Sequence, residues 1–83
     1  MKIHVRYFAA LREALGASET VELAAGATLG TLRDALLARG GAHAELLARH
    51  RAMRAAVQQV MADETVELTE GAEVAFFPPV TGG

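Results

Sequence analysis

The feature that most restricts the fold is the succession of apolar spacings along the sequence. Strand-like spacing, in which every second residue is apolar, gives way to helix-like spacing of three or four residues and then returns. Residues 9–15 have two leucines four positions apart, which predicts a short helix that Gly16 ends. Alternating apolar and polar residues on either side, in residues 1–8 and 18–23, predict two strands that flank this helix. The first strand would turn three side chains toward a core: Ile3, Val5 and Tyr7.

The middle of the chain has the pattern of a longer amphipathic helix. Thr28 is a suitable N-cap, because its hydroxyl can accept a hydrogen bond from a free N–H of the first turn. The pair Gly40-Gly41 is expected to end this helix, and residues 43–51 to form a shorter helical piece with a Glu45–Arg49 ion pair. The apolar stripe of the long helix consists of Leu29, Leu32 and Leu36.

The last third of the chain is predicted to be mostly extended. Residues 54–61 are expected to form one strand, residues 64–68 a short strand, and residues 73–77 the final strand. Pro78-Pro79 ends that strand, because proline has no N–H to donate to a sheet.

The resulting order, strand, helix, strand, long helix and then strands, predicts an α+β fold. The smallest common architecture with this order is the ubiquitin-like β-grasp, a mixed sheet with one long helix packed across one face. Residues 1–77 would form this single domain and residues 78–83 a protruding tail. With 83 residues the chain has only a modest core to bury.

Composition excludes several classes of function. The chain has no cysteine, which excludes disulfides, thiolate metal sites and cysteine nucleophiles. A net charge of −2 gives no basic footprint for nucleic acid. No apolar run approaches the ~20 residues of a membrane span, and the start lacks a secretory signal, so the cytoplasm is the expected compartment. No metal site is expected either, because no metal-ligand spacing is found among His4, His43 and His50.

The tail is the most informative segment for function. Gly82 and Gly83 have no Cβ, so their backbone could thread a tunnel too narrow for other residues. A terminal carboxylate is a poor electrophile, but attack on the α-phosphate of ATP would convert it into a reactive acyl-adenylate. A sulfur nucleophile would then give a thiocarboxylate, and an amine would give an amide conjugate.

Three segments resemble one family in register. Residues 5–13, residues 28–33 and above all residues 71–83, which end Phe-Phe-Pro-Pro-Val-Thr-Gly-Gly, are similar to the small subunit of molybdopterin synthase. The resemblance covers essentially the whole chain. One departure is Gln58, where the family most often has asparagine, which affects a local hydrogen bond only.

The resemblance implies a sulfur-carrying role for a subunit with no catalytic residues beyond its terminal carboxylate. An E1-like adenylating enzyme would use ATP to activate Gly83, and a sulfur-transfer system would convert the adenylate into a thiocarboxylate. The tail would then enter the large synthase subunit, in a heterotetramer with two copies of each subunit, and pass its sulfur to cyclic pyranopterin monophosphate. No bound cofactor is implied for this chain. The residues expected to thread the partner are Pro79, Val80, Thr81 and Gly82.

Contacts with partners are expected on the outer face of the sheet. Alternation in the last strand assigns Val74 and Phe76 to the core and Phe77 to the outer face. Phe77, Phe8 and Met61 could form an apolar patch that anchors a partner, although packing under the helix ends is the alternative for each. The resembled family meets its large subunit with this surface. A basic cluster is either a solvated surface or a docking surface for an acidic partner: Arg49, His50, Arg51 and Arg54.

Other functions remain compatible with the same residues. A related carrier for thiamine or cysteine synthesis would share the tail chemistry, and a ubiquitin-like protein modifier would share the activation step. A β-grasp binding module with an inert tail is a further alternative. The fold cannot separate these functions, whereas the specific tail sequence favours the molybdopterin carrier.

Overall fold

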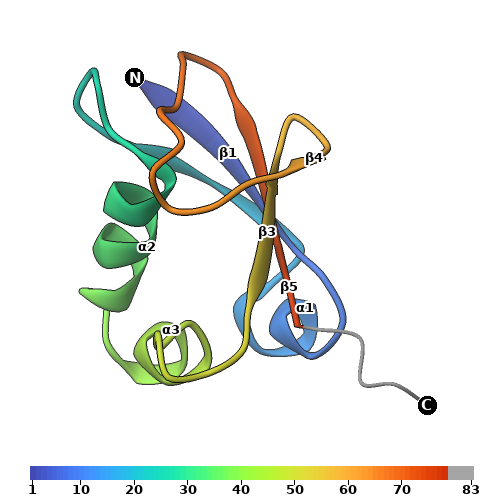
Figure 1. Ribbon diagram of the computed structural model, residues 1–83. Helices are drawn as coiled ribbons and strands as arrows, with labels where there is room; N and C mark the ends of the chain where they lie inside the picture. The colour runs from blue at the N-terminus through green and yellow to red at the C-terminus, as the bar shows by residue number, and fades with distance from the viewer. Residues whose placement is uncertain (79–83) are drawn as a thin grey trace.

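The computed structural model describes residues 1–78 of the protein and shows a mixed sheet with helices packed against it (Figure 1). Within that range the chain forms, in order, β1 (Lys2–Tyr7), α1 (Ala10–Leu15), β2 (Ser18–Glu22), α2 (Leu29–Leu37), α3 (Gly41–Leu46), β3 (Arg54–Val57), β4 (Val60–Met61) and β5 (Glu73–Phe77). The α+β prediction is confirmed. No helix among the described residues is long and apolar enough to cross a membrane.

The sheet has the strand order β2-β1-β5-β3-β4. The first and last strands lie side by side and parallel, with Val5 opposite Val74 and Tyr7 opposite Phe76. The other pairs are antiparallel. Because side chains alternate along each strand, this register sends all four of these residues to the same face. That face forms the core, as the sequence predicts for Val74 and Phe76.

The helices cover this face and leave the opposite face open. In Figure 1, α2 and α3 lie on one side of the sheet. The predicted stripe of α2 is fully buried, and Leu11 of α1 and Leu47 after α3 complete the core with it. Thr28 caps α2 as predicted, because its hydroxyl accepts a hydrogen bond from the N–H of Thr31 at 3.2 Å.

Two helix boundaries differ from the prediction. The long helix, α2, has only nine residues and ends at Leu37, three before Gly40. Both glycines have positive φ, but Gly40 is the N-cap of α3 and Gly41 is its first residue, so they begin the second helix and do not end the first. The predicted helix over residues 43–51 is instead Gly41–Leu46, because Leu47 turns into the core at 0% exposure.

The predicted Glu45–Arg49 pair is wrong, because Arg49 lies in the loop after α3. Its guanidinium instead binds Glu64 at 2.7 Å and Asp34 at 2.6 Å. Glu45 lies 3.8 Å from Arg51. Only the tertiary fold brings Arg49 to these two acids, and the helical spacing could not show it.

The predicted strand over residues 54–61 is a hairpin of β3 and β4. The two-residue turn between them is formed by Gln58 and Gln59, with φ values of 51° and 67°. Positive φ at both central residues is the conformation of a type I′ turn, which matches the twist of the flanking strands. Neither glutamine is a common residue for such a turn, so the sequence carried no signal for it.

The predicted strand over residues 64–68 is absent, and one isolated bridge between Thr28 and Glu67 stands in its place. The backbone of this segment forms hydrogen bonds with the first turn of α2. The N–H groups of Leu29 and Gly30 donate to the carbonyls of Val66 and Glu64, each at 2.9 Å. The first turn of a helix has free N–H groups, and this segment satisfies two of them instead of pairing as a strand.

Glu64 also connects three parts of the chain through ion pairs. Arg33 of α2 lies 3.2 Å from the Glu64 carboxylate and donates to the carbonyls of Leu47 and Ala48 at 2.7 and 2.9 Å. Hydrogen bonds from Arg49 lower the pKa of Glu64; burial acts in the opposite direction, and the charges of Arg49 and Arg33 add to the lowering. The ionised carboxylate is therefore favoured more in the folded chain than in the unfolded chain.

We expect the substitution Gln59→Gly to stabilise the fold, because glycine adopts positive φ without steric cost. The left-handed conformation costs a residue with a side chain roughly 1–2 kcal/mol, which glycine avoids. Glycine also increases the conformational entropy of the unfolded chain, and this offsets part of the stabilisation. The free energy of unfolding should rise by about 0.5 kcal/mol, measured by urea denaturation. The control Gln59→Ala removes the side chain but keeps the strain, so a gain of equal size in that variant would contradict the explanation.

We also expect Glu64→Gln to destabilise the fold in a pH-dependent way. The folded-state pKa of Glu64 is below the usual 4.5, so its stabilisation is present above that pH and is lost as the pH falls below it. The Glu64 side chain is 39% exposed, so solvent screening limits the loss at neutral pH to about 1 kcal/mol. The deficit should be present at neutral pH and shrink once the wild-type carboxyl is protonated.

Thermal or urea unfolding of both chains across this pH range measures that difference. Glu67→Gln is the matched control, because Glu67 is exposed on the same segment and its side chain makes no ion pair within residues 1–78. A deficit that stayed constant with pH, or that appeared equally in Glu67→Gln, would show that the carboxylate charge is not responsible.

Candidate partner-docking face

The candidate site is the sheet face that the helices leave open. Since Tyr7 and Phe76 turn into the core, their neighbours Phe8 and Phe77 turn the other way. The same alternation on β3 sends Ala55 inward and Arg54 outward. We call this surface the open face, and its central residues are Arg6, Phe8, Arg54, Ala56, Met61, Ala75 and Phe77.

The three predicted anchor residues all lie on the open face. Phe8 is 37% exposed and continues β1 beside β5, with its N–H bonded to the carbonyl of Phe76 at 3.1 Å. Phe77 is half-buried and lies opposite Arg54 of β3. Met61 is 51% exposed and lies in the next row, opposite Ala56. The register therefore places them on one face, while their role in partner binding stays a prediction.

Small side chains lie between these anchors. Ala56 and Ala75 are opposite each other in the centre of the sheet, with Met61 beyond one end of the row and Arg6 beyond the other. An apolar strip with two alanines in its middle is a shallow surface that a partner can approach closely. Exposed apolar patches rimmed by polar residues often mark protein–protein contacts, which makes this strip the candidate docking surface.

Two arginines border the strip, and the sequence pointed to only one of them. Arg6 lies with its guanidinium carbon 5.1 Å from the centre of the Phe8 ring and 3.7 Å from a carboxylate oxygen of Glu73. Arg54 was predicted as part of the basic cluster, which the structure divides: Arg49 is used internally, and Arg54 is exposed on the open face. A signal for Arg6 was present, because it precedes Phe8 by two residues and shares its side of β1.

The tail begins where the open face ends. Pro78 follows β5 directly and lines a hollow of about 280 Å³ between α1, α3 and the loop before β3. The predicted reactive and threading residues lie outside the described residues: Pro79, Val80, Thr81, Gly82 and Gly83. The division into a domain of residues 1–77 and a protruding tail stays a prediction.

A polar cluster on the core side fixes this end of the sheet. Glu19 of β2 accepts a hydrogen bond from the Tyr7 hydroxyl at 2.6 Å, pairs with Arg39, and lies 3.2 Å from His43. Burial, with the hydrogen bond to Glu19 and its charge, raises the pKa of Tyr7 well above its ordinary value. Burial opposes ionisation of Glu19, but hydrogen bonds from Tyr7, Arg39 and His43 outweigh it and lower the pKa of Glu19. Tyr7 thus remains a protonated donor and holds β1, and with it Phe8, in place.

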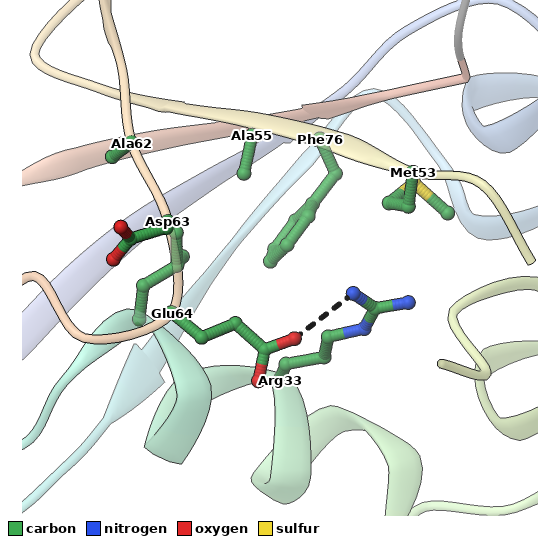
Figure 2. Close-up of a pocket in the computed structure, with 8 residues that line it drawn as sticks. Arg33, Met53, Ala55, Ala62, Asp63, Glu64 and Phe76 are labelled. Atoms are coloured by element: carbon green, nitrogen blue, oxygen red, sulfur yellow. Dashed lines mark hydrogen bonds and ion pairs between the residues drawn. The ribbon is translucent and has the colours of Figure 1, made fainter. Parts of the chain in front are cut away.

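A second hollow, of about 290 Å³, lies on the core side of the sheet (Figure 2). Figure 2 shows Arg33 paired with Glu64 at its base and Phe76 and Met53 above them. Arg33 also donates to two backbone carbonyls, and Asp63 accepts two hydrogen bonds from Thr65. These charged groups are already engaged, so we interpret the hollow as part of the structural network and not as a ligand site.

Within residues 1–78, no group of three histidines or acids lies close enough to hold a metal ion. Gln58, the one departure from the resembled family, has a structural role. Gln58 holds the sheet with both its backbone and its side chain: its N–H donates to the carbonyl of Glu73 at 2.9 Å, and its Oε1 accepts from the Glu73 N–H at 2.5 Å. Although the resembled family most often has asparagine at this position, Gln58 therefore still makes the local hydrogen bond.

Comparisons with known proteins agree along the whole chain. The sequence model of the ThiS family matches residues 5–83. The molybdopterin synthase sulfur carrier subunit of Escherichia coli (strain K12) is 41% identical over 81 residues, covering 98% of this chain and 99% of the relative. The sulfur carrier subunit of the same name from Mycobacterium tuberculosis is 36% identical over 85 residues, covering 100% and 99%.

Solved structures show the same fold. SAMP1 from Haloferax volcanii superposes with a TM-score of 0.81 at 28% identity, over the full length of both chains. A protein–protein complex of subunits 1 and 2 of the molybdopterin-converting factor from Helicobacter pylori contains a chain with a TM-score of 0.72 at 21% identity, again over the full length of both. At that identity the second likeness supports the fold alone.

Proposed function

The chain belongs to the ThiS family, and from that premise we propose that it is the sulfur carrier subunit of a molybdopterin synthase. Two relatives of that name align over nearly their whole length, at 41% and 36% identity. The aligned region includes the tail, because the family match extends to Gly83. The chain is thus a carrier and co-substrate, and its partners supply the catalytic groups.

The proposed cycle takes place at the carboxylate of Gly83. An E1-like adenylating enzyme binds ATP, a carboxylate oxygen attacks the α-phosphorus, and pyrophosphate leaves. Sulfide then forms a C–S bond with the acyl carbon as the bond to AMP breaks, which leaves a thiocarboxylate. In the large subunit the thiocarboxylate sulfur forms a bond to cyclic pyranopterin monophosphate, and water then cleaves the acyl–sulfur bond, which leaves the sulfur on the pterin and returns the carboxylate. The proposed assembly is a heterotetramer with two copies of each subunit.

The observation that carries the proposal is the position of the anchors relative to the tail. Phe77 is the last residue of β5 and Pro78 begins the tail, while the parallel neighbour β1 brings Phe8 to the same end. A partner that binds the open face therefore lies beside the point where the tail starts. Docking and delivery of Gly83 then follow from one contact. This arrangement suits a carrier whose reactive group must enter another protein.

We expect Phe77→Ala to weaken binding to the large subunit about tenfold or more, because truncation of a buried aromatic anchor typically costs more than 1 kcal/mol. Calorimetric titration of the large subunit measures the affinity, and circular dichroism checks that the fold is intact. Val60→Ala is a matched control: Val60 is 67% exposed but lies opposite Val57, on the other side of the sheet. Unchanged affinity in Phe77→Ala, or equal loss in both variants, would refute the anchor role.

We further expect the protein isolated from its host to include a form in which one oxygen is replaced by sulfur. Intact mass spectrometry detects this form directly. One residue added after Gly83 should abolish both the mass change and cofactor synthesis, while leaving the fold and the open-face contact intact. Cofactor synthesis that continued in the extended chain would end the proposal. Isopeptide conjugates of higher mass, in place of the thiocarboxylate, would show instead that the chain is a protein modifier.

A further inference from the structure

We propose that Arg6 and Arg54 select the large subunit, by pairing with carboxylates that border its apolar contact surface. This inference rests on the proposed function and adds the chemistry of the partner's surface to it. The two arginines lie on strands on either side of β5, with Arg6 opposite Ala75 and Arg54 opposite Phe77. Two cations therefore bracket the apolar strip that a partner covers.

The surroundings of Arg6 indicate what this position binds. Its guanidinium lies over the ring of Phe8, with 5.1 Å between the guanidinium carbon and the ring centre. Stacking of this kind leaves N–H donors of an arginine free for a carboxylate. Arg6 is thereby joined to an aromatic anchor, and a partner that covers Phe8 must also accommodate the charge.

Within this chain Arg6 pairs with Glu73, but the pair is weak, so a carboxylate of the partner could replace Glu73. Its oxygen is 3.7 Å from Arg6, beyond hydrogen-bond length, and the two side chains are 41% and 52% exposed. An exposed pair at that distance contributes little and is easily exchanged. By contrast, Arg49 binds its two acids at 2.6 and 2.7 Å. Arg6 is therefore available to a better acceptor in a way that Arg49 is not.

The guanidinium of Arg54 is paired even less than that of Arg6. No acid lies within ion-pair distance of it among residues 1–78. It is exposed and directly opposite Phe77, the anchor nearest the tail. Covering such a cation with an apolar surface would be costly, whereas a facing carboxylate would be favourable. A partner that fits both aromatic rings must consequently carry acids at its border.

The experiment compares single charge reversals in binding to the large subunit at low and physiological salt. Arg6→Glu and Arg54→Glu should each weaken binding about tenfold, with a smaller effect at higher salt. Glu73→Gln should tighten binding, because it removes the internal competitor for Arg6. Lys2→Glu is the matched control at physiological salt: it makes the same charge change on the same face of β1, about 20 Å from Phe8 by strand rise, where the Debye length is only about 8 Å.

The outcomes separate this inference from the proposed function. If the wild-type chain binds but both reversals leave affinity unchanged, or Lys2→Glu weakens it equally, the inference is overturned while the function stands. If Glu73→Gln weakens binding, the competitor argument is wrong. If the wild-type chain neither binds the large subunit nor acquires sulfur, the proposed function itself fails. Arg6→Gln and Arg54→Gln, which remove charge without adding a repulsive one, repeat the test should a reversal unfold the chain.

Discussion

The structure depends on the parallel pairing of β1 with β5, which joins the two ends of the domain in the centre of the sheet. The pairing buries Tyr7 and Phe76 together on the core side, with their rings stacked 6.4 Å apart. By strand alternation the same register brings Phe8 and Phe77 to the open face. The core and the candidate docking face are thus two consequences of one register, and a slip by one residue would exchange them.

Where local spacing decides an element, the sequence predicted it well. The first strand, the cap at Thr28, the leucine stripe of α2 and the whole of β5 were all found from alternation, helical spacing or capping chemistry. The open-face positions of Phe8 and Phe77 also follow from alternation, whereas that of Met61 depends on the two-residue turn, which the sequence did not show. The reason is physical: a half-buried strand or helix must put its apolar residues on one side whatever it packs against.

The errors arose where distant residues decide the local structure. Residues 64–68 alternate like a strand, but their carbonyls accept from the first N–H groups of α2. Gln58 and Gln59 take positive φ because β3 and β4 pair on either side of the turn. The backbone of Glu73 also forms hydrogen bonds with both the backbone and the side chain of Gln58. Arg49 leaves its helical neighbour for Glu64 and Asp34. Apart from the hairpin pairing itself, these partners are 15 or more residues apart in the sequence, so no local pattern could reveal them.

Backbone strain lies beside the open face. Within residues 1–78, the three residues other than glycine with positive φ are Ala9, Gln58 and Gln59. Ala9 directly follows Phe8, and the two glutamines form the turn that sets Met61 opposite Ala56. Strained conformations persist only where the surrounding structure enforces them, and they concentrate at functional sites. Because a fold alone does not determine function, the open-face residues beside these strained positions, together with the tail, are the candidates for distinguishing one partner from another.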